Sequence, residues 1–433
     1  MNSLKIANSY GVAEQGIAPA KYATADISFT QPRALTGTIL SYSLLLLFFV
    51  LLYSQLPTLV PVLATIRLVY IVGAAAILTM FIERMMSQRG WELVWPESHL
   101  LLGFLVAVAF SCFGALWPHY AVDSTLDLIK AVALYFVIVV TVSSGRRLQG
   151  LLLVMVFGGL FPAIGTLQNY SQGQLVEGRA SWVGIFANPN ELAYSLVILV
   201  PLAAYLAMEV PPWKAAVLWI IIAVYIAAIY VSFSRGGMLG LLAVLALVVL
   251  RRSRAFTRTL MLVLLAASLA LISYGWSRDV GFTQLGTDST LQERLATIQG
   301  GLAMFADHPI SGVGVGNSVI AWPLYAPPGI YYGRWLVIHN TFVQTLSETG
   351  ILGFLPFTLL LVVALYDAHK MSRHGSQPAS GNTGRLATGL EIALWGFVIC
   401  GLSGGFALSW FPYILIGLTS SLKRITQNER RLP

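Results

Sequence analysis

His339 is the residue whose type and position in this sequence best suit acid–base chemistry. It closes a polar stretch, 276–338, that is set between long apolar runs. The next apolar run opens with Asn340, Gln344 and Glu348, whose spacing places them on one helix face. A neutral imidazole can accept a proton near pH 7. We therefore predict that His339 is a general base above a polar, cavity-lining stripe; its alternative role is a capping or interface histidine.

Three arginines in polar stretches are suited to binding an anion: Arg179, Arg235 and Arg294. A guanidinium group stays charged, and its planar fork matches phosphate oxygens. Arg235 lies between Ser234 and the glycines 236–237 at the start of an apolar run. Backbone amides at a helix N-terminus can bind a phosphate, and glycines without side chains let it approach the backbone. An N-cap followed by a tight turn explains the same four residues equally well.

The composition indicates that these residues belong to a membrane protein. Of the 433 residues, 57% are hydrophobic and 10% are charged, whereas soluble proteins carry about 25% charged residues. Apolar runs of about twenty residues are typical of membrane-spanning helices. We predict an all-α polytopic membrane protein with about twelve spans, at 37–56, 59–82, 98–117, 122–143, 147–168, 191–209, 213–232, 236–250, 258–275, 340–366, 386–403 and 407–421.

These spans divide the chain into five parts: an N-terminal tail (1–36), spans one to nine (37–275), a partly helical loop domain (276–338), spans ten to twelve (340–421) and a C-terminal tail (422–433). If both tails are cytoplasmic, most of the 26 lysines and arginines fall in inner segments. This is the positive-inside pattern, so we expect cytoplasmic termini and His339 on the outer face. The same distribution argues against nucleic-acid binding.

Two basic residues are predicted within spans, Arg67 and Lys130. Each lies eight residues inside its span, a depth of roughly 12 Å at the helical rise. An unpaired charge there costs on the order of 3 kcal/mol. Asp127, one turn from Lys130, can pair with it. Arg67 has no acidic neighbour in the sequence, so we expect it to line a cavity or meet an anionic ligand.

The outer loops have recognisable local signals. In Asn188-Pro189-Asn190, we expect Asn190 to cap the helix that follows and both asparagines to line the site. A helix is predicted over 290–306, with an apolar stripe that should pack on the membrane body: Leu291, Leu295, Ile298, Leu302 and Phe305. The aromatic stretch 322–335 suits sugar stacking or a membrane-interface belt.

Four segments occur in an order and spacing that resemble a known family: FANPNELA, SRGG, ERLATIQGGLAMFADHPISGVGVGNS and HNTFVQTLSETGILG. Over about residues 98–366 the chain resembles the O-antigen ligase and O-antigen polymerase superfamily of bacterial envelope enzymes. The resemblance implies a GT-C-like helical glycosyltransferase of the bacterial inner membrane, with its active site facing the periplasm. It also implies an undecaprenyl-diphosphate-linked O-antigen donor and inverting transfer without metal or cofactor; for a ligase, the acceptor is a sugar hydroxyl of lipid A–core.

Under this resemblance, we expect Arg179 and Arg235 to bind the donor diphosphate, with Arg294 and Lys130 as second choices, and His339 to activate the acceptor hydroxyl. The loop layout favours a ligase over a polymerase, which would use the same donor with another glycan as acceptor. A polytopic transporter is the alternative from a different class. The sequence has no evident internal repeat, and its polar groups concentrate near one face, which is unlike many transporters.

Overall fold

The computed structural model describes residues 39–87, 93–252, 259, 289–330, 333–374 and 381–431. All of them belong to the unit Gly37–Pro433. The predicted tail 1–36, nearly all of the predicted ninth span, 258–275, and the first part of the predicted loop domain, 276–288, lie outside the described residues.

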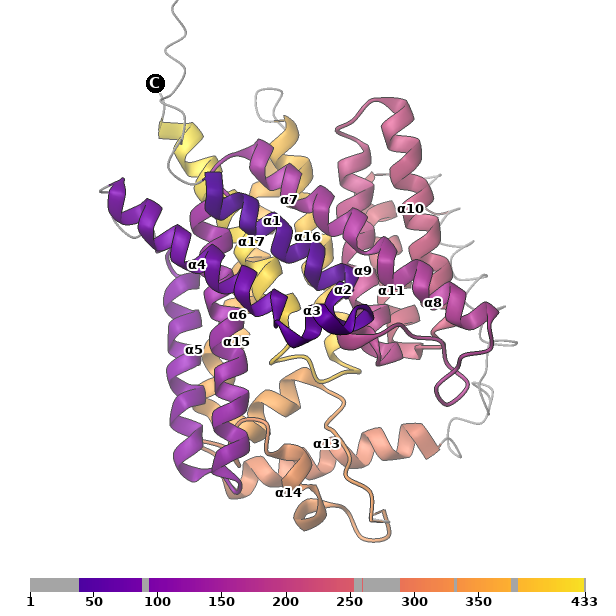
Figure 1. Ribbon diagram of the computed structural model, residues 1–433. Helices are drawn as coiled ribbons and strands as arrows, with labels where there is room; N and C mark the ends of the chain where they lie inside the picture. Colours follow the sequence, from indigo (N-terminus) through magenta and orange to yellow (C-terminus); the bar gives the residue numbers. More distant parts are fainter. Residues whose placement is uncertain are drawn as a thin grey trace, which may run out of the picture. The chain divides into compact units, whose positions relative to one another are not determined.

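The regular elements of the described residues are helices, as predicted (Figure 1). In chain order they are α1 (Ile39–Ser54), α2 (Leu56–Leu59), α3 (Pro61–Thr65), α4 (Leu68–Met86), α5 (Glu97–Ser111), η2 (Cys112–Gly114), α6 (Pro118–Thr141), α7 (Gly145–Gly158), α8 (Leu160–Ser171), η3 (Gly184–Phe186), α9 (Pro189–Ala207), α10 (Pro212–Val231), α11 (Arg235–Arg252), α13 (Ser289–Asp307), α14 (Ser318–Tyr325), α15 (Thr341–His374), α16 (Gly381–Gly401) and α17 (Trp410–Arg431). Within the described residues, eight helical segments are long and apolar enough to cross a membrane. The chain is therefore an all-α polytopic membrane protein.

Helix α9 is the most deeply buried of these eight segments, because 89% of the residues in its apolar stretch are buried inside the protein. It packs against α7, α10, α11 and α16. Close approach of its neighbours α11 and α16 depends on glycine, because a Cβ at Gly240 of α11 would lie 2.4 Å from Cys400 Sγ and one at Gly396 of α16 would lie 2.9 Å from Val244. Small residues are the usual contact in membrane helix packing, where lipid gives no hydrophobic drive for association. Helix α9 is thus the central helix of the bundle, and the loops near its first turn are positioned by it.

Helix α15 is bent where the sequence predicts a continuous span. Gly350 has φ 59° and ψ −162°, a combination open essentially to glycine, and it separates 341–349 from 351–374. The bend leaves two amides without helical acceptors. They are satisfied by the chain after α13, because Ile351 N donates to Pro309 O at 2.9 Å and Leu352 N to Ile310 O at 3.3 Å.

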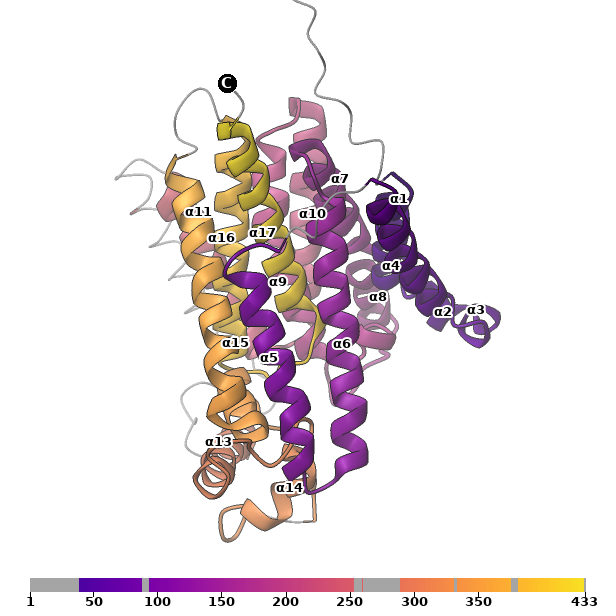
Figure 2. The same ribbon diagram turned by 90° about the vertical axis from the view of Figure 1, so that its left-hand side faces the viewer.

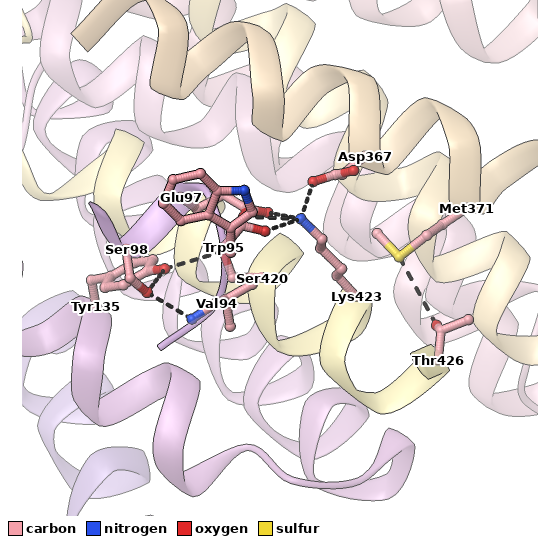
Figure 3. Close-up of polar contacts among 10 residues, drawn as sticks. All are labelled: Val94, Trp95, Glu97, Ser98, Tyr135, Asp367, Met371, Ser420, Lys423 and Thr426. Carbon is pink, nitrogen blue, oxygen red and sulfur yellow. Dashed lines mark hydrogen bonds and ion pairs between the residues drawn. The ribbon is translucent and has the colours of Figure 1, made fainter. Parts of the chain in front are cut away.

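The two ends of α15 define the two ends of the bundle, which we call the His339 end and the Lys423 end. At the Lys423 end, α5, α15 and α17 are joined by a buried ion cluster (Figure 3). Lys423 Nζ lies 3.0 Å from Glu97 and 2.7 Å from Asp367, and it also donates to Trp95 O. Glu97 is fully buried. A buried carboxylate must be paired, so Lys423 holds three helices together.

The position of Arg67 differs from the sequence prediction. The predicted span 59–82 is interrupted, because α3 ends at Thr65 and Arg67 adopts a left-handed φ of 51° before α4 begins at Leu68. Arg67 is an exposed residue at the start of a helix. The argument for a charge eight residues inside a span is therefore wrong, and a cavity-lining role for Arg67 stays an untested prediction.

We expect the Lys423→Met substitution to destabilise the helical bundle. Removing the ammonium group leaves two carboxylates buried without their cation, which costs about 3 kcal/mol. The midpoint of thermal unfolding of the detergent-solubilised protein should therefore fall clearly. Lys214→Met is the matched control, because Lys214 is exposed and lies over the Trp213 ring. Equal midpoints for the two variants would show that the ion cluster does not join the helices as described.

Candidate functional site

The loop between α8 and α9, the loop between α10 and α11, and the start of α9 meet at the side chain of Asn190. Its Oδ1 accepts hydrogen bonds from Arg179 Nη2 at 2.6 Å and from Ser234 Oγ at 2.8 Å. Arg179 Nε also donates to Ser232 O at 3.1 Å. The residue that caps α9 is Asn188, whose Oδ1 accepts from Asn190 N at 2.8 Å. The predicted capping role of Asn190 is therefore wrong, because this buried side chain joins the loops instead.

The loop that carries Arg179 is fixed along its length. Asn169 Nδ2 donates to Ser181 O at 2.8 Å, and Ala180 N donates to Val231 O at 3.2 Å. At its far side, Gly184 packs so closely on Gln55 that a Cβ would lie 1.8 Å from Gln55 Oε1. These contacts hold the Arg179 backbone against the ends of α8 and α10.

The glycines after Arg235 serve packing in this structure. A Cβ at Gly236 would lie 2.3 Å from the Tyr194 hydroxyl, and one at Gly237 would lie 2.5 Å from the Ala193 methyl group. Ser234 caps α11, since Gly237 N donates to its Oγ at 3.2 Å. The predicted approach of a phosphate to these glycines is replaced by contact with α9. Arg235 begins α11 and is half-buried.

Helix α13 confirms the predicted helix over 290–306, but the face it buries differs from the prediction. Its buried residues are small or slender, and Gly301 is so close to Val343 and Ile338 that a Cβ would lie 2.7 and 2.8 Å from them. Leu295 and Leu302 of the predicted packing stripe are 52% and 46% exposed. These two leucines do not pack on the body, because the glycine face allows a closer approach of backbones, while Leu291, Ile298 and Phe305 are half-buried.

Arg294 of α13 is half-buried at the His339 end. Its Nε is buried and has no hydrogen-bond partner within the described part of the chain. Its positive charge acts on His339 and on the Tyr194 hydroxyl of α9. A buried polar group without a partner costs free energy that a ligand can recover, and a guanidinium group selects an anion.

His339 is near enough to Arg294 and Arg179 for the charges of both to act on it. It is half-buried and stands one residue before the cap of α15. Burial, together with the positive charges of Arg294 and Arg179, lowers the pKa of His339 to about 4. Both effects disfavour the imidazolium form. His339 is therefore neutral at physiological pH and has a ring nitrogen able to accept a proton.

The connection between α16 and α17 closes the site from another side. Asn340 Nδ2 donates to Leu402 O at 3.2 Å, and its Oδ1 caps α15 by accepting from Phe342 N and Val343 N. Thr341 Oγ1 donates to Gly404 O at 2.7 Å. Asn340 is thus a cap at the edge of the site; its role in lining a cavity stays a prediction.

Gln344 and Glu348 hold the loop domain to α15, and their role in lining a cavity stays a prediction. Glu348 is almost fully buried and accepts hydrogen bonds from Ser318 Oγ and, at 3.5 Å, from Gln344 Nε2. The glycine-rich turn docks beside them, with Gly314 N donating to Glu348 O at 3.1 Å. The bend at Gly350 separates these residues from the rest of the span.

Lys130 is in the ion pair that its sequence neighbourhood allows. Its Nζ lies 2.7 Å from Asp127 Oδ1 and 5.2 Å from the centre of the Tyr70 ring. The ion pair is within α6, and the ring contact joins α6 to α4. Lys130 is consequently a weaker candidate for a ligand-binding cation than Arg179 or Arg294.

Sequence reasoning missed Tyr194. Its hydroxyl lies 2.9 Å from Ser403 Oγ and so connects α9 to the α16–α17 connection. A signal was present, because Tyr194 is four residues after Asn190 and the two must share a helix face. Ser403 had no comparable signal, since it is distant in sequence from the other loops.

The fold and site together define a polytopic helical membrane protein with a neutral histidine and cationic side chains at one end. A family model described as O-Antigen ligase matches residues 216–358, a segment that contains Arg235, Arg294 and His339. The match supports membership in the superfamily of O-antigen ligases and polymerases, as the sequence motifs predicted. The family implies an enzyme that acts on lipid-linked polysaccharide in a membrane. No curated protein matches the chain.

We predict that Asn190→Leu will release the Arg179 loop. The substitution removes the oxygen that accepts from Arg179 and Ser234, so the loop should open about tenfold more often, as expected for loss of a charged hydrogen bond. Tryptic cleavage after Arg179, followed as the fragment that begins at Ala180, measures this opening. Gln174→Leu, at an exposed position of the same loop, should cleave at the wild-type rate. Equal rates in the two variants would refute the role of Asn190.

Proposed function

We propose that this protein is an O-antigen ligase, which transfers glycan from undecaprenyl diphosphate to a sugar hydroxyl of lipid A–core. The observation that carries the proposal is the position of His339, kept neutral beside Arg179 and Arg294. A base beside a concentration of positive charge is suited to joining a hydroxyl nucleophile to a donor with an anionic leaving group.

The reaction proceeds by direct displacement. The acceptor oxygen attacks the anomeric carbon of the donor sugar while the bond from that carbon to the diphosphate oxygen breaks. His339 takes the hydroxyl proton, and undecaprenyl diphosphate leaves with the bonding electrons. Attack from the face opposite the leaving group inverts the anomeric carbon.

Arg179 and Arg294 are the proposed ligands of the diphosphate. Arg294 brings a buried Nε with no partner among the described residues, and Arg179 is held in place by Asn190 and Ser232. Arg235, which follows the Asn190 partner Ser234, is the next candidate. Stabilising the leaving group in this way needs no metal ion, because fixed cations meet the charge that develops on the diphosphate.

The proposed orientation follows from the distribution of charge along the sequence. Basic residues are abundant in the segments assigned to the inner side, which favours cytoplasmic termini. The Lys423 end then faces the cytoplasm and the His339 end faces the periplasm, across the bacterial inner membrane. This orientation places the base on the side where finished O-antigen and lipid A–core are both exposed.

We expect His339→Ala and His339→Gln to lower the rate of transfer by about a hundredfold or more, since neither side chain can accept the proton. The test is a lipopolysaccharide gel from a host that lacks this gene and is complemented with each variant at matched expression. Both variants should give bare lipid A–core, with full-length glycan retained on its polyprenyl carrier. Val337→Ala, an exposed neighbour, should restore the wild-type pattern.

Two outcomes of that gel contradict the proposal in different ways. Normal ladders from both histidine variants would remove the assignment of His339 as base. Core that carries a single repeat unit in the host lacking the gene would identify a polymerase, with the same donor and another acceptor.

The pH dependence of transfer should differ between the free and the donor-bound protein. In the free protein the pKa of His339 is about 4. The value of kcat/KM should therefore stay constant as pH falls below 6.5, and it should decline only when pH approaches the histidine pKa of about 4. A bound diphosphate offsets the arginine charges and raises the histidine pKa, so kcat should decline at a higher pH. Transfer rates measured from pH 4 to 8 check this order, and the residual rate of His339→Gln should lack both declines.

A further inference from the structure

Helix α13 has an apolar edge that none of the described residues covers. Leu295 and Leu302 are 52% and 46% exposed, and they continue the line of Leu291, Ile298 and Phe305, which are half-buried. The opposite face packs through Gly300 against Trp322 of α14 and through Gly301 against Ile338. An apolar edge, beside a polar edge that contains Gln292 and Gln299, is the pattern of a helix lying at a membrane surface.

The position of Arg294 fixes the direction in which this apolar edge points. Successive residues of a helix are about 100° apart, so Leu291 and Ile298, three before and four after Arg294, share its face. Arg294 acts on His339 and on Tyr194 of the central helix α9. The face of α13 that carries Arg294 is therefore turned toward the spans, and the leucine edge lies next to this face. The polar edge, which contains Gln292 and Gln299, is turned away from the spans.

The loop between α5 and α6 fixes the level of α13 along the bundle. Leu116 N donates to Val313 O at 3.2 Å, and Trp117 N donates to Asn317 Oδ1 at 2.7 Å. The turn that follows α13 is thus attached where two membrane spans end. Phe113 and Trp117, at this turn of the chain, are 89% and 59% exposed, as expected of an aromatic belt at a membrane interface.

The direction of the helix axis agrees with this level. Figure 1 shows α13 lying across the His339 end of the bundle, and in the view turned by 90° the same helix is seen nearly end-on (Figure 2). Its axis therefore runs across the axes of the spans. A helix with this direction, at the level of the span ends, lies in the plane of the membrane surface.

We propose that α13 is an interfacial helix whose leucine edge, Leu295 and Leu302, contacts the acyl chains of bilayer lipids at the His339 end. The lipid contact itself is independent of the proposed transferase reaction. Its consequence for the site rests on that function: lipid on the leucine edge and packing on the glycine face together fix the rotation of α13, and this rotation aims Arg294 at the site.

The proposal is tested with a fluorescent probe on single cysteines introduced as Leu302→Cys or Leu295→Cys, with Cys112 and Cys400 replaced by alanine. Ala303→Cys is the matched control, since residue 303 is exposed and lies about 100° round the helix from residue 302. Each labelled protein is placed in donor-free phospholipid nanodiscs. Quenching by lipids that carry a nitroxide on the acyl chain is compared with quenching by aqueous iodide.

We expect acyl-chain nitroxide to quench the probes at 302 and 295 several-fold more than the probe at 303, and iodide to show the reverse order. Equal quenching at the three positions, or iodide quenching at 302 and 295, would overturn the proposal. Protection of both leucine positions from both quenchers would also overturn it, because a protein surface would then cover the edge. None of these outcomes bears on whether the protein transfers glycan.

The consequence for the site has a separate test. Leu302→Glu should lower transfer at least tenfold by drawing the apolar edge out of the lipid, whereas Ala303→Glu should leave transfer unchanged. If probe quenching places the edge in lipid but Leu302→Glu transfers normally, lipid contact does not control the aim of Arg294. If wild-type protein makes no glycosidic bond, the proposed function fails while the quenching result stands.

Discussion

The site depends on the carbonyl oxygen of one buried side chain, Asn190. This oxygen accepts from Arg179 of one loop and Ser234 of another, and it is carried by the first turn of α9, the most buried span. A neutral acceptor holds a guanidinium group at a defined place and leaves its positive charge in position to act on His339. The packed centre of the bundle thereby fixes the position of a charged group at its surface.

A second constraint is the bend at Gly350, which turns the start of α15 into a platform for the loop domain. The freed amides of Ile351 and Leu352 bind the chain that follows α13, and Glu348 binds Ser318. His339 precedes this platform by a few residues and Arg294 lies on the helix that packs against it. His339 and Arg294 are therefore both positioned by the start of α15.

The all-helical membrane fold, most span positions and the helix of the loop domain followed from periodicity, because long apolar runs have few alternatives. That the charges of Arg179 and Arg294 act on His339 was predictable in kind, since the predicted topology puts all three residues on one side of the membrane. Details set by backbone geometry were not predictable: the left-handed Arg67 delays the start of α4 to Leu68, and Gly350 divides α15 just after Gln344 and Glu348. The pattern also identified the apolar edge of α13 correctly but could not say that glycine, not leucine, would face the protein.

Basic side chains are paired with carboxylates at one end of the bundle, whereas at the other end the Arg294 Nε has no hydrogen-bond partner among the described residues. At the Lys423 end, buried carboxylates meet basic side chains directly: Lys423 pairs with Glu97 and Asp367, and Arg251 with Glu391. At the His339 end, the Arg294 Nε has no hydrogen-bond partner among the described residues, and its charge acts on a neutral histidine. The ion pairs at the Lys423 end join helices, because each buried charge is offset by its partner on another helix. At the His339 end the cost of burying the Arg294 Nε is not offset by any described residue, and this unmet hydrogen bond is the reason for proposing an anionic ligand there.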